Sequence, residues 1–334
     1  MDLQIPVSLF KNFTLKTFHI LKVFDILKSF QKNRVIILMY HRFSKQEERF
    51  KICQSVFDRQ IQYLSKNFNI ISLDKYISNL SNNIKNYPDN SLVITIDDGY
   101  YDNYEYAYPV LKHYSVPATI FLTTDFIDKK KWLWANKLEY ILKNSNSNSL
   151  EVLISGEKVK FQLNNFNNIH RAQLIIFNYC KTICNESKDI YINEIAKKLN
   201  VNVPKYTVNE FKALTWDVIK EMSNNRIDFG AHSMSHPILS KLSSEEIYKE
   251  IFYSKSLIEK QIGNCINCFC YPNGQLEDVN IEVINMLKKV GYLCAVSTIN
   301  GANILGKTDQ FFLKRLALGT DNIPRIQRIL TNLY

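Results

Sequence analysis

Short apolar runs alternate with amphipathic segments along most of the chain, beginning near residue 35. The runs are too short for core helices, whereas the segments between them repeat their apolar positions every three or four residues. This alternation predicts β-strands connected by helices, and therefore a parallel sheet. The predicted strands are 35–40, 70–73, 92–96, 118–122, 227–231, 266–271, 292–297 and 312–318. The predicted helices are 56–67, one that opens at Asp74, 104–114, 215–223, 244–261, 279–290 and 324–333.

The number of strand–helix units predicts how the sheet is arranged. Seven or eight units favour a closed α/β barrel over an open sheet. The alternation stops between residues 125 and 212, where a polar run and a hairpin-like stretch indicate an inserted subdomain. The predicted organisation is an N-terminal basic amphipathic helix (1–34), a first barrel part (35–124), the inserted subdomain (125–212) and a second barrel part (213–334).

Composition narrows the class of protein. Hydrophobic residues make up 46% and charged residues 22%, which excludes global disorder, and 9 Gly with 8 Pro exclude collagen-like or linker-like chains. The net charge of +10 is spread along the chain without a run of five basic residues. We therefore expect a solvated basic surface and no nucleic-acid partner.

The cysteines and the N-terminus bear on location. Seven Cys form an odd set without the spacing of a disulfide scaffold, which favours a reducing compartment. Lysines interrupt residues 8–33, so neither a signal peptide nor a membrane span is evident. We expect a cytoplasmic protein. Residues 8–33 either pack on their own domain or contact the inner face of the membrane peripherally.

Two adjacent carboxylates, Asp97 and Asp98, directly follow the apolar run 92–96. Buried carboxylates are costly unless a cation compensates them. Adjacent strand residues point to opposite faces, but a turn at Gly99 can aim both side chains into one cavity. The alternative is a solvated Asp-Gly turn.

His232 and His236 follow the predicted strand 227–231. Two histidines four apart on a helical turn share one face and can bind one metal ion. Together with a carboxylate they form a set of two imidazoles and one carboxylate, which suits Zn²⁺ and other divalent ions. Because the carboxyl ends of parallel barrel strands share one face, these motifs are expected to converge there.

Two further strand ends carry polar or glycine-bearing segments. His41 follows the strand 35–40, and Tyr271 opens the segment 271–274, Tyr-Pro-Asn-Gly. Four such strand ends are unlikely to fall on one barrel face by chance, so the sequence predicts an active site there.

Several of these motifs resemble the polysaccharide deacetylase (NodB homology) family, carbohydrate esterase family 4. The segments that carry the resemblance are 39–42 (Met-Tyr-His-Arg), 95–99 (Thr-Ile-Asp-Asp-Gly), 117–122 (Pro-Ala-Thr-Ile-Phe-Leu), 232–236 (His-Ser-Met-Ser-His) and 269–274 (Phe-Cys-Tyr-Pro-Asn-Gly). The match covers residues 35–124 and 213–320, and the residues between them look like an insertion seen in a subset of the family.

The resemblance implies a distorted (β/α) barrel and a metal-dependent hydrolase that removes an N-acetyl group from an amino sugar. Asp98, His232 and His236 would bind the metal, most simply Zn²⁺, with Co²⁺, Ni²⁺ or Fe²⁺ as alternatives. Asp97 would be the general base, and Tyr271 would offer its backbone N–H to the oxyanion. The implied partner is a glycan or a lipid-linked sugar.

The chain departs from the family pattern at two places. Phe269 stands where many members have an arginine at the start of the third motif, and the segment 313–318 lacks the histidine that serves as general acid. We expect Arg315 to replace the missing arginine as the charge partner of Asp97, and His41 to lie near the site. The general acid is not assigned.

Other functions remain open at this stage. The same site could hydrolyse another C–N bond, as in a deformylase or a cyclic amidase. The departures also allow a degenerate, non-catalytic carbohydrate-binding protein. Trp132 and Trp134 could stack on sugar rings or anchor the core of the insertion.

Overall fold

Seven parallel strands close into a barrel, as the sequence predicted. The computed structural model describes residues 33–81 and 88–331, so the predicted N-terminal helix lies outside the described residues. Each strand pairs with the next, and β1 pairs with β5 to close the ring. In ring order the strands are β1 (Arg34–Tyr40), β5 (Ser91–Ile96), β6 (Ala118–Leu122), β9 (Ile227–Ala231), β10 (Cys268–Cys270), β11 (Cys294–Asn300) and β13 (Leu313–Ala317).

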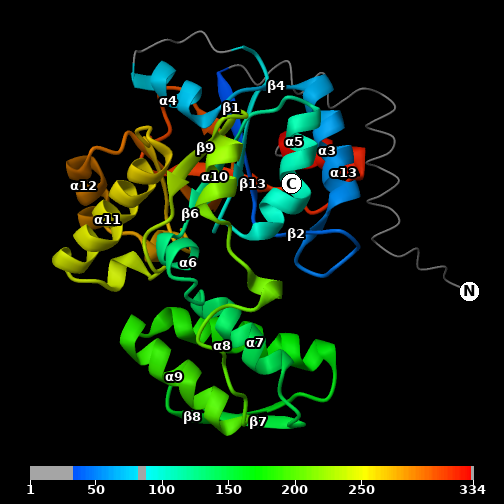
Figure 1. Ribbon diagram of the computed structural model, residues 1–334, viewed down its shortest axis with the longest axis vertical. Coiled ribbons are helices and arrows are strands. Elements are labelled where there is room, and N and C mark those ends of the chain that lie inside the picture. Colours follow the sequence, from blue (N-terminus) through cyan, green and yellow to red (C-terminus); the bar gives the residue numbers. More distant parts are fainter. Residues whose placement is uncertain (1–32, 82–87, 332–334) are drawn as a thin grey trace, which may run out of the picture.

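Helices cover the outside of this barrel (Figure 1). They are α3 (Gln54–Asn67), α4 (Leu73–Ser81), the π-helical η1 (Asn103–Ala107), α5 (Tyr108–His113), α6 (Thr124–Asp128), α10 (Trp216–Ser223), α11 (Ser244–Ile262), α12 (Ile281–Val290) and α13 (Ile323–Thr331). The short elements are β2 (Phe43–Ser44), β3 (Ile52–Cys53), β4 (Asn69–Ile70), β12 (Asn303–Ile304) and the 3-10 turns Asn209–Phe211, Leu239–Lys241 and Leu276–Asp278.

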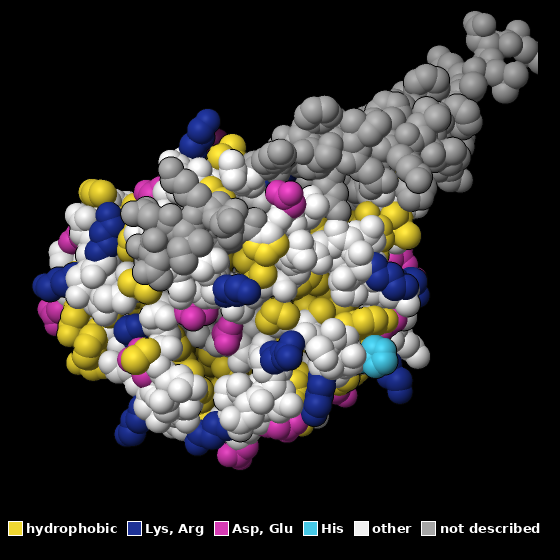
Figure 2. All heavy atoms as spheres, turned by 90° about the horizontal axis from the view of Figure 1, so that it is seen from above, with side chains coloured by type: hydrophobic (Ala, Val, Ile, Leu, Met, Phe, Trp, Pro, Cys, Tyr) yellow, Lys and Arg dark blue, Asp and Glu magenta, His cyan; other side chains and the backbone are white. Residues whose placement is uncertain are grey.

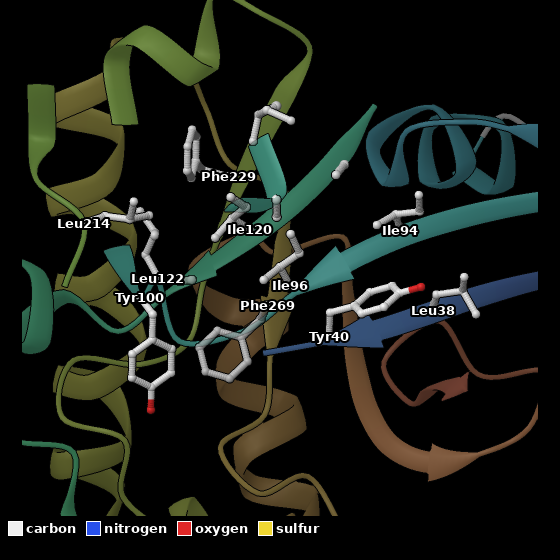
Figure 3. Close-up of a cluster of buried hydrophobic side chains, with 14 of the residues drawn as sticks. Leu38, Tyr40, Ile94, Ile96, Tyr100, Ile120, Leu122, Leu214, Phe229 and Phe269 are labelled. Atoms are coloured by element: carbon white, nitrogen blue, oxygen red, sulfur yellow. The ribbon is translucent and has the colours of Figure 1, made fainter. Parts of the chain in front are cut away.

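Alternate residues of each strand face opposite sides of the barrel wall, and the outward set forms the largest core. Leu38, Ile94, Ile96 and Ile120 belong to this core and pack beneath the surrounding helices (Figure 3). Their side chains are all buried. Burial on both faces explains why these strands are apolar runs and do not alternate with polar residues.

The inward set fills the lumen and changes character along the barrel axis. Apolar side chains such as Ile37, Val93 and Leu313 form a second buried cluster inside it. Phe121 belongs to the same cluster, and a Cβ built on Gly230 would lie 2.6 Å from its ring, so glycine leaves room for this packing. Towards the carboxyl ends the lumen becomes polar and holds Arg315, which is 1% exposed.

The insertion packs around its own core at one end of the barrel (Figure 1). Its elements are α7 (Trp134–Lys143), β7 (Ser149–Ile154), β8 (Glu157–Gln162), α8 (Phe166–Thr182) and α9 (Asn185–Lys198). Trp134 is 5% exposed and belongs to this core, which agrees with the interpretation that it anchors the insertion. The chain enters the insertion after β6 and returns before β9, so the insertion lies at the carboxyl ends of the strands.

The sequence misplaced the boundary between β4 and α4. The predicted strand 70–73 ends at Ile70, and α4 already begins at Leu73. Asp74 does not cap this helix, because the Ser72 hydroxyl accepts the Lys75 N–H at 3.1 Å and Asp74 lies in the first turn. A serine two residues earlier thus takes the capping role that the prediction gave to Asp74.

The surface at the end of the barrel opposite the insertion is of mixed charge. Figure 2 shows Lys and Arg side chains interspersed with Asp and Glu on this face. None of the helices in the described ranges combines the length and hydropathy that a membrane span requires.

Candidate metal and catalytic site

The turn after β5 presents both aspartates at the carboxyl end of the barrel. The Asp97 N–H donates to Tyr40 O at 2.9 Å, and the Gly99 N–H returns to Asp97 O at 3.0 Å. Asp98 adopts φ +75° and Gly99 φ +85°. A Cβ on Gly99 would approach Leu122 to 2.9 Å, so the tight turn depends on glycine. Both aspartates are buried, which excludes a solvated Asp-Gly turn.

Asp97 forms the ion pair with Arg315 that the sequence predicted. The two guanidinium nitrogens donate to the two carboxylate oxygens, each at 2.7 Å. Arg315 also donates to Ser297 O at 2.7 Å and to the Thr95 hydroxyl at 3.1 Å, so the lumen fixes its orientation. Burial alone would raise the pKa of Asp97, but the charges of Arg315 and His41 outweigh it and hold this pKa below its usual range.

The mouth of the barrel is the end at which the strands have their carboxyl ends. His41 lies at its rim and not in the core. Its Nε2 is 3.5 Å from Asp97 Oδ2, and its side chain is 42% exposed. The Asn103 amide holds the backbone in place by donating to His41 O at 2.8 Å. The imidazole is therefore accessible to a ligand while its main chain is fixed.

His232 and His236 lie on an irregular loop, which corrects the predicted helical turn. Ser233 and His236 adopt φ of +62° and +60°, the left-handed region that non-glycine residues rarely occupy. The Ser233 hydroxyl accepts the His236 N–H at 3.0 Å, which closes the loop on itself. The two imidazoles still face each other, with ring centroids 4.8 Å apart.

Neighbouring elements hold this loop in its unusual conformation. Glu250 of α11 accepts from the N–H groups of Met234 at 2.7 Å and Ser235 at 2.9 Å, and from the Ser235 hydroxyl at 2.6 Å. The first turn of α6 adds a bond from the Asp125 N–H to Met234 O at 2.8 Å. Backbone strain of this kind persists only where surrounding contacts over-determine it.

Asp98, His232 and His236 converge on one point. Asp98 Oδ1 lies 3.4 Å from His232 Nε2 and 3.6 Å from His236 Nε2. Candidate ligand atoms of all three residues lie within 4.8 Å of one another. Asp98 Oδ1 is buried without a hydrogen-bond partner among the described residues, a state that is costly unless a cation completes it.

The two histidines differ in protonation. His232 Nδ1 lies 2.7 Å from Cys270 O, an acceptor only, so Nδ1 carries a proton and Nε2 is the nitrogen that can face a metal ion. Burial, reinforced by the neighbouring His232, lowers the pKa of His236 to about 3, so its imidazole is neutral. Burial opposes a charge on His232 as well, but Cys270 and Asp98 outweigh it and hold the pKa of His232 well above its usual range, so a metal ion would have to displace the proton on Nε2. A set of two imidazoles and one carboxylate suits a divalent cation.

Tyr271 does not offer the backbone donor that the resemblance implied. Its N–H donates to Val296 O at 3.2 Å within the barrel wall, and its hydroxyl donates to Phe311 O at 2.7 Å. The extended pairing of β10 with β11 therefore uses the N–H that the prediction left free. The oxyanion donor remains unassigned.

The third motif brings a residue to the site that sequence reasoning missed. Phe269 points outward and contacts the Tyr292 ring at 5.4 Å, whereas Cys270 points into the lumen. Cys270 Sγ lies 3.3 Å from the Arg315 guanidinium. The inward-facing residue of this strand is thus Cys270, whose small side chain leaves room for Arg315. Period-two alternation along 268–270 was the available signal.

A protein-family model supports these observations. The model described as polysaccharide deacetylase matches residues 84–152 and 174–295. The unmatched stretch between the two matched segments includes β8 and the start of α8, both within the insertion.

Curated relatives are named as deacetylases as well. A Bacillus subtilis protein named as a polysaccharide deacetylase, YxkH, is 32% identical over 113 residues, 34% of this chain and 40% of that protein. The aligned part thus spans less than half of YxkH. The poly-β-1,6-N-acetyl-D-glucosamine N-deacetylase of Staphylococcus epidermidis is 28% identical over 235 residues, 60% of this chain and 73% of that enzyme.

Solved structures share the fold. The Streptococcus pyogenes deacetylase PplD, determined in complex with acetate, aligns with a TM-score of 0.58 at 19% identity, over 87% of this chain and 95% of that one. IcaB from Ammonifex degensii aligns with a TM-score of 0.59 at 17% identity, over 90% of this chain and 98% of that one.

Proposed function

Because this chain belongs to the polysaccharide deacetylase family, hydrolases that act on carbon–nitrogen bonds other than peptide bonds, we propose that it removes the N-acetyl group from an amino sugar of a polysaccharide or glycoconjugate. The observation that carries the proposal is the cluster of Asp98, His232 and His236 beside the separate carboxylate of Asp97. The relative from S. epidermidis is named for a polymer of N-acetylglucosamine, which makes that sugar the first substrate to test.

We propose that Asp98, His232 and His236 hold a divalent metal ion, most simply Zn²⁺. The donor set and the unpartnered oxygen of Asp98 support this assignment. When bound, such an ion lowers the pKa of a water molecule and polarises the acyl oxygen of the substrate.

Asp97 is proposed to act as the general base. Arg315 engages both of its oxygens, so the carboxylate is kept ionised and oriented before a substrate arrives. An ionised carboxylate at the mouth can accept the proton of an attacking water. The bidentate pair also limits rotation of the carboxylate, which preserves its aim.

His41 is proposed to supply the proton that the departing amine requires. It is the half-exposed imidazole beside Asp97, and its backbone is fixed by Asn103. This assignment gives the missing general acid to a residue at the end of β1. Replacing His41 with glutamine, which keeps a hydrogen-bonding side chain, is expected to lower kcat by about 10²-fold, the lower end of general acid catalysis.

Acetate release tests the proposed reaction. The protein is loaded with Zn²⁺ and incubated with N-acetylglucosamine oligomers, and acetate and formate are measured in parallel. Release of acetate, with a free amine appearing on the sugar, supports deacetylation. Release of formate or of neither acid by a protein with a full complement of metal contradicts it.

The metal assignment has its own measurement. Elemental analysis of the purified wild-type protein and of His236→Ala is expected to show a bound ion only in the wild type. Equal metal content in the two proteins would remove His236 from the ligand set without excluding the reaction.

A further inference from the structure

A second hollow lies in the insertion, away from the catalytic mouth. It is an open depression of about 650 Å³ between α7, the end of α9 and the segment that follows α9. None of the residues that line it belongs to the site at the barrel mouth. Ligand sites in proteins have volumes of this order, so the hollow is large enough for a sugar residue with a substituent.

The lining of this hollow is cationic. Lys137, Lys197 and Lys205 contribute to it, and no aspartate or glutamate does. Within the described part of the chain, none of these three lysines has a carboxylate within 4.0 Å. Among the described residues, therefore, no carboxylate competes with a bound anion for these three ammonium groups.

Some other lysines of the insertion do pair with carboxylates. Lys129 and Lys131 both contact Asp125 at 2.7 Å, and Lys143 contacts Glu139 at 2.7 Å. Lys137 instead donates to the Asn193 amide oxygen at 2.6 Å. Burial lowers the pKa of Lys137 against the opposing charge of Asp189, so its ammonium group is incompletely solvated.

The neutral part of the lining suits a saccharide. Three asparagines supply amide donors and acceptors: Asn193, Asn200 and Asn202. Trp132 forms part of the wall, held by a bond from its indole N–H to Pro204 O at 2.8 Å and by packing on Tyr140 and Phe211. Amide groups beside one aromatic ring can bind hydroxyl groups and the apolar face of a sugar.

We propose that this hollow binds an anionic saccharide, a sugar unit carrying a carboxylate or a phosphate. The three lysines bind the anionic group, and the asparagines and Trp132 contact the ring. Residues 125–212 hold fourteen Lys and Arg against nine Asp and Glu, so the whole insertion favours approach of such a ligand. The site does not depend on the catalytic proposal, since a chain without hydrolase activity would still bind there.

A saccharide fits better than a nucleic acid. Surfaces that bind single-stranded nucleic acid use successive aromatic rings as a stacking platform. The hollow offers one ring, Trp132, and that ring is half-buried.

Two triple variants with equal loss of charge test the proposal by calorimetric titration. The first replaces Lys137, Lys197 and Lys205 with glutamine, and the second replaces Lys158, Lys160 and Lys198 of the same subdomain. The probes are a hyaluronan hexasaccharide, N-acetylglucosamine 6-phosphate, neutral N-acetylglucosamine hexamer and oligothymidylate. Matching thermal unfolding curves confirm that both variants are folded.

We expect the wild-type chain to bind one or both anionic sugars at least about tenfold more tightly than the neutral hexamer, a difference of 1.4 kcal/mol. The first variant should lose this preference and the second should keep it. Comparing the carboxylate and phosphate probes identifies the preferred anion. Equal loss in both variants, equal affinity for the neutral hexamer, or tighter binding of oligothymidylate would each overturn the proposal.

Discussion

The adjacent aspartates Asp97 and Asp98 lie on two sides of the barrel mouth and have different partners there. On the side formed by Arg315, the charge of Asp97 is already matched, with both oxygens bonded at 2.7 Å. On the side formed by the histidine loop, Asp98 faces two imidazoles at 3.4 and 3.6 Å and keeps a buried oxygen without a hydrogen-bond partner among the described residues. One residue of separation in the chain thus gives two different electrostatic environments.

The difference teaches how one turn can supply two chemical functions. A carboxylate matched by a fixed arginine is ionised and oriented, which suits proton transfer. A carboxylate that faces two imidazoles and has an oxygen without a hydrogen-bond partner suits a metal ion. The pKa values of both carboxyl groups are held below their usual range, so the two aspartates differ in their partners and not in their protonation.

Removing Asp98 should have the largest effect. Asp98→Ala is expected to weaken Zn²⁺ binding by more than about 100-fold, because even an indirect supporting contact of a metal ligand is worth 10–100-fold. Acetate release should fall to the background rate. Metal affinity is measured by competition with a chromogenic chelator. Retention of full affinity would show that Asp98 is not a ligand.

Asp97→Asn should impair proton transfer without affecting metal binding. Loss of the general base is expected to lower kcat by roughly 10²–10⁴-fold while Zn²⁺ affinity stays at the wild-type value. Steady-state kinetics and the same chelator competition provide both readouts. If metal binding falls in parallel with kcat, the two aspartates share one role and the comparison fails.

Arg315→Met should destabilise the fold and shift the acid limb of the pH profile. Breaking a buried pair by removing one partner costs about 3–5 kcal/mol, which denaturant titration measures. The depressed pKa of Asp97 stabilises the fold above the pKa of an unfolded aspartate, and this contribution is lost as pH falls through the lower folded value. Without Arg315 the pKa of Asp97 rises, so activity should fall off at a higher pH.

Arg42→Met is the matched control for that variant. Arg42 pairs with Asp102 at 2.8 Å in another ion pair of the barrel. Loss of the Arg42–Asp102 pair should also lower the stability of the fold, but it should leave the acid limb of the pH–activity profile unchanged. Identical shifts in both variants would mean that the limb reports general unfolding and not the ionisation of Asp97.

Glu250→Ala should have the smallest effect and should act only on the histidine side. Loss of the three bonds to Met234 and Ser235 is expected to weaken Zn²⁺ binding by about 10–100-fold. Glu259→Ala on the same helix is the control, because Glu259 accepts the Ile266 N–H at 2.9 Å, away from the metal loop. Equal losses of affinity in both variants would reduce Glu250 to a general role in stability.

Much of the barrel and of the candidate site could be predicted from the sequence, because buried parallel strands are recognisable as apolar runs. The run 92–96 ends where the acidic pair begins, so the position of Asp97 and Asp98 at a strand end followed directly. Arg315 was expected from the family resemblance, because Phe269 stands where many members have the arginine that would pair with Asp97. The described structure contains that pair.

The remainder depended on information that local patterns do not carry. Ser233 and His236 adopt the left-handed conformation although neither is a glycine, so the sequence contained no sign of an irregular loop and the segment resembled a helical turn. Glu250 reaches this loop only because of the way α11 packs on the barrel. The N–H of Tyr271 is occupied because of the register between β10 and β11, which no single segment determines.

The insertion between β6 and β9 has a consequence for how the chain reaches its native state. These neighbouring strands pair over five residues, from Ala118 with Ile227 to Leu122 with Ala231, although the whole insertion lies between them. The entropy cost of closing a loop grows only with the logarithm of its length, and a segment that collapses around its own core shortens the effective loop. Early folding of the insertion would therefore bring the two edges together, and slower folding of that segment would delay the final ring closure.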